Sequence, residues 1–188
     1  YGQHYIDKNG EGILAFITNN SFIDGITHRQ MRKSLMQSFD KIYIIDLHGN
    51  AKKKETAPDG SKDENVFDIM TGVSINIFVK TGINKNGELG KVYHSDIYGK
   101  RDYKYEILTG SNLNSFIYSE LEVLAPNYFF TAKNLSLQED YDKGFLINKF
   151  FINYSTGVQT KRDAFCIQRT RKELEDIRED FNLLDNVS

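Results

Sequence analysis

Two amide side chains follow the first apolar run of the sequence. Asn19 and Asn20 come directly after the run 12–18. If this run is a strand of an α/β sheet, the amides lie at its carboxyl end, where such sheets bind their ligands. The sequence therefore predicts a contact between these amides and a ligand. The alternative is that they cap the next helix or shape the turn before it.

A long polar segment follows the second apolar run, 41–47, and begins with His48 and Asn50. It extends to residue 65 without periodicity, and a connection of this length is typical of a functional or mobile loop. Lys52 and Lys53 in this segment would supply sequence-independent contacts to nucleic-acid phosphates. The alternative is an ordinary solvated charge run, because nearby Asp and Glu side chains cancel much of its charge.

A third group of polar side chains opens the segment 27–39, where His28 and Arg29 precede Arg32 and Lys33. This basic cluster could contact phosphate or form a solvated helix face. The four histidines lack ligand spacing with the single cysteine or with an acid cluster, so no metal site is predicted. The sequence also has no nucleophile elbow and no phosphate-binding P-loop.

The hydrophobic patterns predict the elements that position these residues. Continuous apolar runs favour buried strands, and apolar residues at helical spacing favour a helix. Strand, helix and strand in succession predict a βαβ unit with a right-handed crossover. The predicted elements are strands at 12–18, 41–47, 73–79 and 91–97 (the last an edge strand), a helix at 27–39 and a hairpin-like turn at 84–90.

The pattern of apolar and polar residues changes after about Gly110. A helix is predicted over 113–124, ended by Pro126, followed by a strand-like aromatic segment at 128–130. A charged amphipathic helix is predicted over 172–184. The chain is therefore divided into residues 1–110 and 111–188.

The composition bounds the class of protein. The 188 residues carry a formal charge of −2 and one cysteine, Cys166, which excludes an internal disulfide framework. No apolar run approaches the roughly 20 residues that span a bilayer. We expect a protein of the cytoplasm. Because the sequence does not begin with Met, we also expect an internal segment of a longer chain.

Several strings, taken in order, resemble a known family: residues 15–25, 27–29, 46–50, 62–69, 72–75, 98–101 and 157–163. Together they are similar to the C-terminal half of the methyltransferase domain in the type ISP and type IIG-like restriction-modification enzymes. These enzymes transfer a methyl group from S-adenosylmethionine to N6 of adenine in duplex DNA.

The resemblance implies an α/β fold, a partial Rossmann-like methyltransferase sheet that contains only its later strands, followed by an α+β segment. Residues 1–110 would be the later half of the methyltransferase core, and 111–188 a linker and the start of a target-recognition domain. Neither the Gly-rich cofactor turn nor a Pro-Pro tetrapeptide is present, since Pro58 and Pro126 are the only prolines. We therefore expect this segment to bind no cofactor and to be inactive alone.

The resemblance also assigns roles to residues. Phe78 takes the place of an aromatic that stacks on a flipped adenine, beside Asn19 and Asn20, with a core phenylalanine as the alternative. The edge that bears His48, Asn50, Lys52 and Lys53 would face DNA, as would His28 and Arg29. Lys161 and Arg162 fall where the family enters its recognition domain, and they would contact the duplex or have a structural role.

The partners implied are duplex DNA and the rest of the polypeptide, with its cofactor-binding half and possible nuclease and helicase domains. The alternative function is a noncatalytic DNA- or protein-interaction module derived from a methyltransferase half. A self-contained α/β enzyme of another kind lacks a supporting motif.

Overall fold

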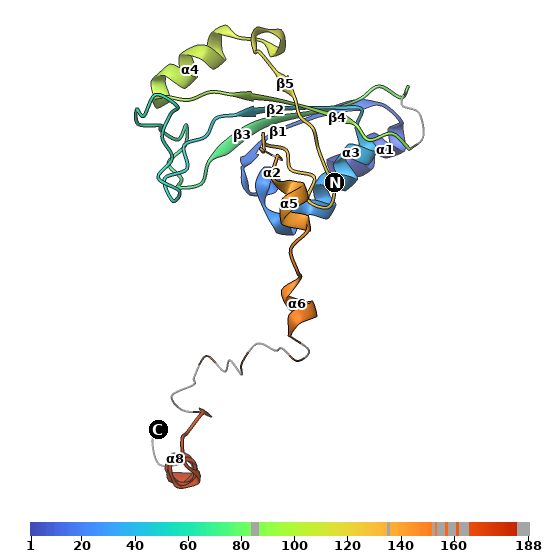
Figure 1. Cartoon of the computed structure of the whole chain (residues 1–188). Helices are drawn as coiled ribbons and strands as arrows, with labels where there is room; N and C mark the ends of the chain where they lie inside the picture. Colours follow the sequence, from blue (N-terminus) through green and yellow to red (C-terminus); the bar gives the residue numbers. More distant parts are fainter. Residues whose placement is uncertain are drawn as a thin grey trace. The chain divides into compact units, whose positions relative to one another are not determined.

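The computed structural model describes residues 1–83, 87–134, 136–151, 153, 157, 161 and 166–183. The chain forms two compact units, residues 1–134 and 135–188. Figure 1 shows a sheet covered by helices in the first unit and separate helices in the second. The described helices of the second unit are α5 (Gln138–Asp142), α6 (Ile147–Phe150) and α8 (Arg171–Leu183).

The first unit is built on a five-stranded mixed sheet with the strand order β1-β3-β2-β4-β5. Its strands are β1 (Gly12–Asn19), β2 (Lys41–Asp46), β3 (Val73–Lys80), β4 (Lys91–Asp96) and β5 (Ser119–Glu120). β3 is antiparallel to both β1 and β2, whereas β2 and β4 are parallel. Strands β1, β2 and β4 therefore point the same way, and their carboxyl ends share one edge of the sheet.

Helices cover the two faces of this sheet unequally (Figure 1). They are α1 (Gly2–Asn9), α2 (Ser21–Asp24), η1 (Ile26–His28), α3 (Arg29–Ser38), α4 (Arg101–Gly110) and η2 (Leu113–Ser115). A large core joins α2 and α3 to one face and includes Phe39, Ile42, Phe78 and Phe130. A smaller core under α4 on the other face is centred on Ile45 and Leu47.

β1 departs from the sequence prediction of a strand buried on both faces. It pairs with β3 alone, and Ile13, Phe16 and Ile17 remain 69%, 53% and 53% exposed. The strand type is confirmed, but within residues 1–134 no described element covers its outer edge. A continuous apolar run indicates that these side chains favour burial. It does not indicate whether residues of this chain pack against them.

The pairing of the strands corrects several other predictions. β1 and β2 are parallel, as a βαβ unit requires, but β3 lies between them. β3 and β4 do not form a hairpin, because β2 separates them. Nor is β4 an edge strand, since β5 pairs with its residues Tyr93 and His94. Residues 84–86 of the predicted turn lie outside the described residues.

The segment after α4 also differs from its prediction. Residues 113–124 form η2 and β5 instead of a helix, and 128–130 are a loop that packs Phe130 into the larger core. The predicted tail helix is confirmed as α8. The fold is thus mixed α/β with a mixed sheet, which is compatible with the expected partial Rossmann-like class.

One buried ion pair fixes the polar loop between β2 and β3. Lys104 of α4 is fully buried, and its ammonium lies 2.8 Å from Asp63 Oδ1. The same ammonium donates to the carbonyl oxygens of Leu47 (2.6 Å) and Glu64 (2.7 Å). Asp63 in turn accepts the backbone N–H groups of Gly49 (2.6 Å) and Gly99 (2.7 Å). The loop is therefore tied to the ends of both parallel strands.

We predict that Lys104→Met lowers the free energy of unfolding by about 3–5 kcal/mol, because it leaves the buried Asp63 charge without its cation. Chemical denaturation of the purified protein measures the loss. The matched control is Lys52→Met at an exposed lysine, with an expected change within about 0.5 kcal/mol. A loss as small in Lys104→Met as in the control would contradict this role.

Candidate functional site

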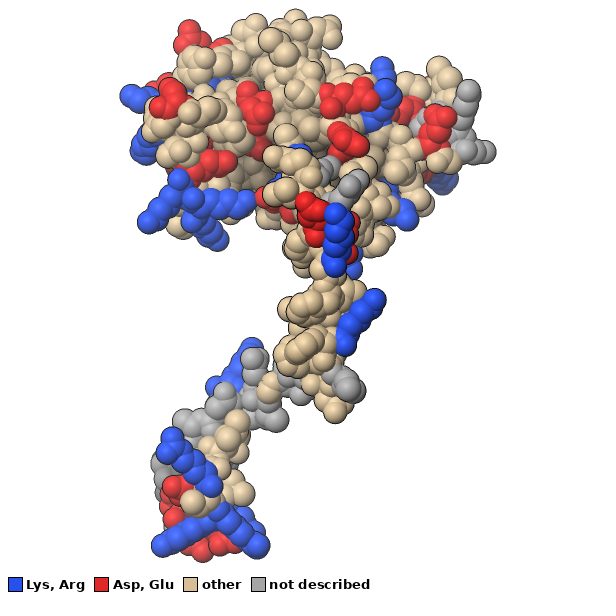
Figure 2. Space-filling model, viewed as in Figure 1, with Lys and Arg blue, Asp and Glu red and all other residues tan. Residues whose placement is uncertain are grey.

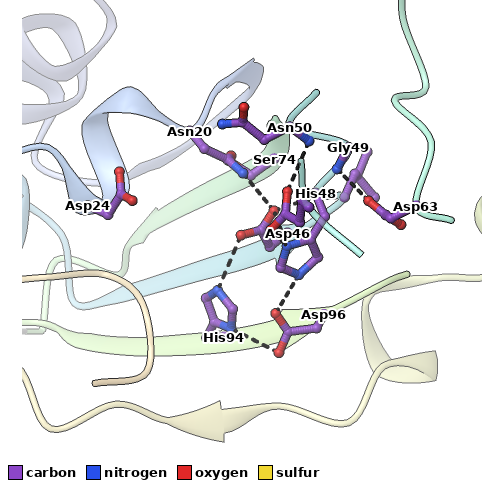
Figure 3. A network of polar contacts seen from close by, with 12 residues as sticks. Asn20, Asp24, Asp46, His48, Gly49, Asn50, Asp63, Ser74, His94 and Asp96 are labelled. Carbon is purple, nitrogen blue, oxygen red and sulfur yellow. Dashed lines mark hydrogen bonds and ion pairs between the residues drawn. The ribbon is translucent and has the colours of Figure 1, made fainter. Parts of the chain in front are cut away.

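The carboxyl ends of β2 and β4 surround a polar hollow of about 270 Å³. Asp46 ends β2, Asp96 ends β4, and Asn20 follows β1 directly. Asp46 and Asp96 are paired in the register of the parallel strands. Figure 3 shows these side chains converging with His48 and His94. Residues far apart in the sequence therefore meet because three strands end at the same place.

Asp46 is held firmly at the base of the hollow. Its Oδ1 accepts the side-chain amide of Asn20 at 2.7 Å and the backbone N–H of His48 at 2.8 Å. Burial raises the pKa of Asp46, and the neighbouring His48 and the hydrogen bond from Asn20 offset only part of that rise. This carboxylate is thus fixed in orientation while its negative charge is poorly solvated.

His48 occupies a strained backbone position, with φ of 51°, which costs a non-glycine residue about 1–3 kcal/mol. Its imidazole compensates through several contacts. Nδ1 lies 2.9 Å from Glu55 Oε1, Nε2 lies 2.8 Å from Asp96 Oδ1, and the ring stacks on Tyr98 at 3.8 Å. Burial alone would lower the pKa of His48, but the surrounding carboxylates Asp96, Asp46 and Glu55 outweigh it and raise that pKa.

The next residue in the chain must be glycine. Gly49 has φ of 79°, and a Cβ there would lie 2.4 Å from the Cα of Asn65. The left-handed turn formed by His48 and Gly49 directs the polar loop back toward Asp63. The same turn brings the His48 ring over the end of β4.

His94 completes an alternating ring of two carboxylates and two imidazoles (Figure 3). Its Nδ1 lies 3.5 Å from Asp96 Oδ2, and its Nε2 lies 3.9 Å from Asp46 Oδ2. Burial would raise the pKa of Asp96, yet the hydrogen bonds from His48 and His94 lower it well below its usual range. Burial together with the nearby Asp96 raises the pKa of Tyr98 to about 12.

The hollow brings together several residues predicted from the sequence. Asn20, His48, Asn50 and Lys53 all line it. Asn20 does not cap α2, because its amide is directed to Asp46. Asn19 is exposed and accepts the backbone N–H of Ser21, which confirms the turn-shaping alternative for that residue.

The basic residues near α3 lie outside this hollow. His28 is half-buried at the end of η1, and Arg29 is exposed at the start of α3. Arg32, by contrast, is fully buried and donates to the carbonyl oxygens of Phe22, Gly25 and Asn127. The prediction that Arg32 belongs to a phosphate-binding cluster is wrong. Its guanidinium already connects the loop at Asn127 to the two ends of α2.

The lysines of the polar loop are exposed, as phosphate contacts require. Lys53 makes an ion pair with Asp24 at 2.9 Å, while the side chain of Lys52 is exposed to solvent. Lys and Arg side chains gather at the lower left of the first unit in Figure 2, where Figure 1 shows the loop between β2 and β3.

Phe78 lies away from the hollow within the first unit. Phe78 is 5% exposed, packs on Phe39 with ring centroids 5.3 Å apart, and is paired with Leu14 and Ile42 at the amino ends of β1 and β2. It is a core residue at the edge opposite Asn20, so the structure does not bring the two together. Lys161 is exposed. Arg162 lies outside the described residues.

Sequence reasoning missed the acids and the second histidine of the ring. Asp46, Glu55, His94 and Asp96 line the hollow, but their proximity depends on the pairing of β2 with β4. The signal in the sequence that could have identified two of them was an Asp at the end of each of two predicted strands.

No described helix is long and apolar enough to cross a bilayer.

Comparison with known proteins places this chain beside segments of much larger DNA-bound enzymes. No protein-family profile and no curated protein matches the sequence. The ATP-dependent type ISP restriction-modification enzyme LlaBIII bound to DNA is similar at 32% identity and a TM-score of 0.53 over 69% of this chain. The DrdV–DNA complex matches 91% of the chain at 27% identity and a TM-score of 0.57.

A nuclease-deletion mutant of the type ISP restriction-modification enzyme LlaGI, in complex with a DNA substrate mimic, matches 70% at 25% identity and a TM-score of 0.56. The chain spans only 9%, 18% and 11% of these three proteins. It is therefore related to a segment of restriction-modification enzymes.

The raised pKa of His48 predicts a pH-dependent contribution to stability. A group whose pKa is raised on folding stabilises the protein fully below its unfolded value, here 6.5, and loses that contribution as the pH rises through the folded value. His48→Gln should therefore reduce the free energy of unfolding most below pH 6.5, and less at alkaline pH. Thermal unfolding across pH measures the difference, with exposed His4→Gln as the control. A difference that is constant with pH would rule out this coupling.

Proposed function

We propose that this chain is the later part of the methyltransferase region of a restriction-modification enzyme. The intact protein would transfer a methyl group from S-adenosylmethionine to N6 of adenine in duplex DNA. The observation that carries the proposal is an apolar strand left bare at the border of a sheet, in a chain similar to segments of restriction-modification enzymes. An exposed apolar strand of this kind is stabilised when further polypeptide packs against it. Most of the length of those relatives lies outside the segment that matches this chain.

The exposed face next to β1 supports this reading. Ile13 and Ile17 of β1 lie on the same face as Ile75 and Ile77 of β3, which are only half-buried. Contiguous apolar surface of this kind is rare on monomers and marks an interaction site. An unpaired strand edge beside it offers backbone hydrogen bonds as well. A preceding part of the same sheet would satisfy both needs.

The polar edge suits contact with a nucleic acid in two ways. The exposed lysines Lys52 and Lys53 would contact phosphates, with His28, Arg29, Lys161 and Arg162 as further candidates. The hollow is lined with acceptors such as Asp46 and Asp96, which repel phosphate but suit the amino group of a base. Asn20 Oδ1 is a buried acceptor without a hydrogen-bond partner among the described residues, and it would accept a hydrogen bond from the base only after its side chain shifts.

Methylation of an adenine amino group needs no strong base from this chain. It needs the nitrogen held in line with the methyl group and the base held still outside the helix. His48 and Asn50 line the hollow and would take that positioning role. Phe78, our sequence candidate for stacking on the base, lies at the opposite edge of the sheet, so we assign it no contact in the hollow.

S-adenosylmethionine does not fit the residues present here. The sequence offers no Gly-rich turn at a helix start to hold it. We therefore assign the cofactor to the part of the polypeptide that would cover β1, and no step of the reaction to this chain's contact with it.

The intact protein is expected to transfer tritium-labelled methyl groups from S-adenosylmethionine to N6 of adenine in duplex DNA. The double variant Lys52→Ala, Lys53→Ala should weaken DNA binding. It should also reduce the slope of log affinity against log salt by up to about 2, because each lost phosphate contact removes about 0.9. Binding isotherms at several salt concentrations measure that slope.

The control for this experiment is Lys8→Ala, Lys41→Ala, which removes the same charge from exposed residues away from the hollow. If adenine is labelled but the slope does not change in the Lys52→Ala, Lys53→Ala variant, the loop does not contact DNA, although the proposed methyl transfer stands. DNA binding without any methyl transfer would favour the noncatalytic module instead.

The substitution Ile17→Lys tests directly whether further polypeptide packs against β1 in the intact protein. In the 188-residue chain the side chain is exposed, so unfolding should change by no more than about 0.5 kcal/mol. In the intact protein the same charge would be buried without a partner and should cost at least about 2 kcal/mol. Ile83→Lys, at a residue 84% exposed away from this face, is the control. Equal effects of Ile17→Lys in both proteins would show that nothing covers β1.

A further inference from the structure

Three metal-binding side chains meet at the floor of the hollow. Asp46 and Asp96 are register partners at the ends of the adjacent parallel strands β2 and β4, and His94 lies two residues before Asp96. One ligand atom from each of the three lies within 4.8 Å of the others. The two strands thus present two carboxylates and one imidazole from the same face.

Both carboxylates are anchored through one oxygen and turn the other toward His94 (Figure 3). Asp46 Oδ1 accepts from Asn20 and from the backbone of His48, while its Oδ2 lies 3.9 Å from His94 Nε2. Asp96 Oδ1 contacts His48 at 2.8 Å, while its Oδ2 lies 3.5 Å from His94 Nδ1. Hydrogen bonds to the non-coordinating atoms are the outer shell that metal sites use to orient their ligands.

His94 supplies an independent sign that something is bound here. Its side chain is 6% exposed, and its Nε2 has no hydrogen-bond partner among the residues that the structure describes. Leaving a buried polar atom unsatisfied costs about 1–3 kcal/mol. Asp96 Oδ2 is 3.5 Å from the other ring nitrogen, Nδ1, at the limit of a hydrogen bond. The carboxylate oxygen facing Nε2, Asp46 Oδ2, is 3.9 Å away, beyond hydrogen-bond length. A cation bound by Nε2 and by the two carboxylates would give this atom a partner.

We propose that Asp46, His94 and Asp96 bind one divalent transition-metal ion, Mn²⁺ or Zn²⁺. The three ligand atoms now lie within 4.8 Å of one another. Ligand atoms about 2.1 Å from such an ion lie roughly 3.0–3.5 Å apart, so side-chain shifts of about an ångström close the site. Two carboxylates balance the charge of the ion, and the imidazole favours a transition metal over Mg²⁺ or Ca²⁺. The open side of the hollow leaves room for water or another ligand on the ion.

This metal site goes beyond the proposed methyl transfer and does not depend on it. It rests only on the geometry of β2 and β4. The proposed methylation can therefore fail while metal binding holds, and the reverse is equally possible.

The test is equilibrium dialysis of the metal-stripped intact protein against Mn²⁺ and, separately, Zn²⁺. The wild-type protein is expected to bind one equivalent more than His94→Ala, or to bind that equivalent at least about 10-fold more tightly. Asp96→Asn is the second variant, because it keeps the shape of a side chain that is 43% exposed and so preserves the fold. Comparing wild type with variants cancels any other metal site in the intact protein.

Asp24→Asn serves as the matched control, because Asp24 lines the same hollow but is not in the three-residue cluster. It should bind metal as the wild type does, and an excess of Mg²⁺ should not displace Mn²⁺. Metal binding that is equal in wild type, His94→Ala and Asp96→Asn would overturn the proposal. Displacement by equimolar Mg²⁺ would overturn it too, since the hollow would then be only a nonselective acidic surface.

Discussion

The buried contact between Lys104 and Asp63 is the interaction on which the arrangement of the site depends. One carboxylate accepts the backbone N–H of Gly49 after β2 and of Gly99 after β4. One ammonium donates to the carbonyl oxygens of Leu47 after β2 and of Glu64 in the polar loop. An isolated buried charge would be very unfavourable, so each partner requires the other. Through this pair, a polar loop with no hydrophobic periodicity is held against the ends of two strands. His48 and Glu55 take their positions from it.

The second constraint is the direction of the strands. Because β3 is inserted antiparallel between β1 and β2, strands β1, β2 and β4 can all point one way while the chain returns between them. Asn20, Asp46 and Asp96 are separated by many residues in sequence, yet each stands at or just after the end of a strand at the same edge. The acids would repel each other in isolation. They are tolerated because His48 and His94 alternate with them around the ring.

How much of this could be predicted from the sequence depends on whether the signal was local. The strands at 41–47 and 73–79 and the helix at 27–39 carry strong periodic patterns and were predicted correctly. Pairing is not local, so the turn before β4 was misread as a hairpin. Helix α4 was missed because its buried contact is made by a lysine, Lys104, and not by an apolar stripe. The amides and His48 were predicted from their places after apolar runs. His94 was assigned to an edge strand, because the sequence gives no sign that β5 pairs with β4 on one side and β2 on the other.

The bare edge of β1 also has a consequence for handling this polypeptide. The run from Ile13 to Thr18 contains no charge and no proline, and its outer backbone groups are unpaired. Segments of this composition pair with copies of themselves and stack into cross-β assemblies. Produced apart from whatever normally covers this strand, the segment would aggregate edge to edge. A lysine placed at Ala15 or Phe16 would act as a gatekeeper and keep it in solution.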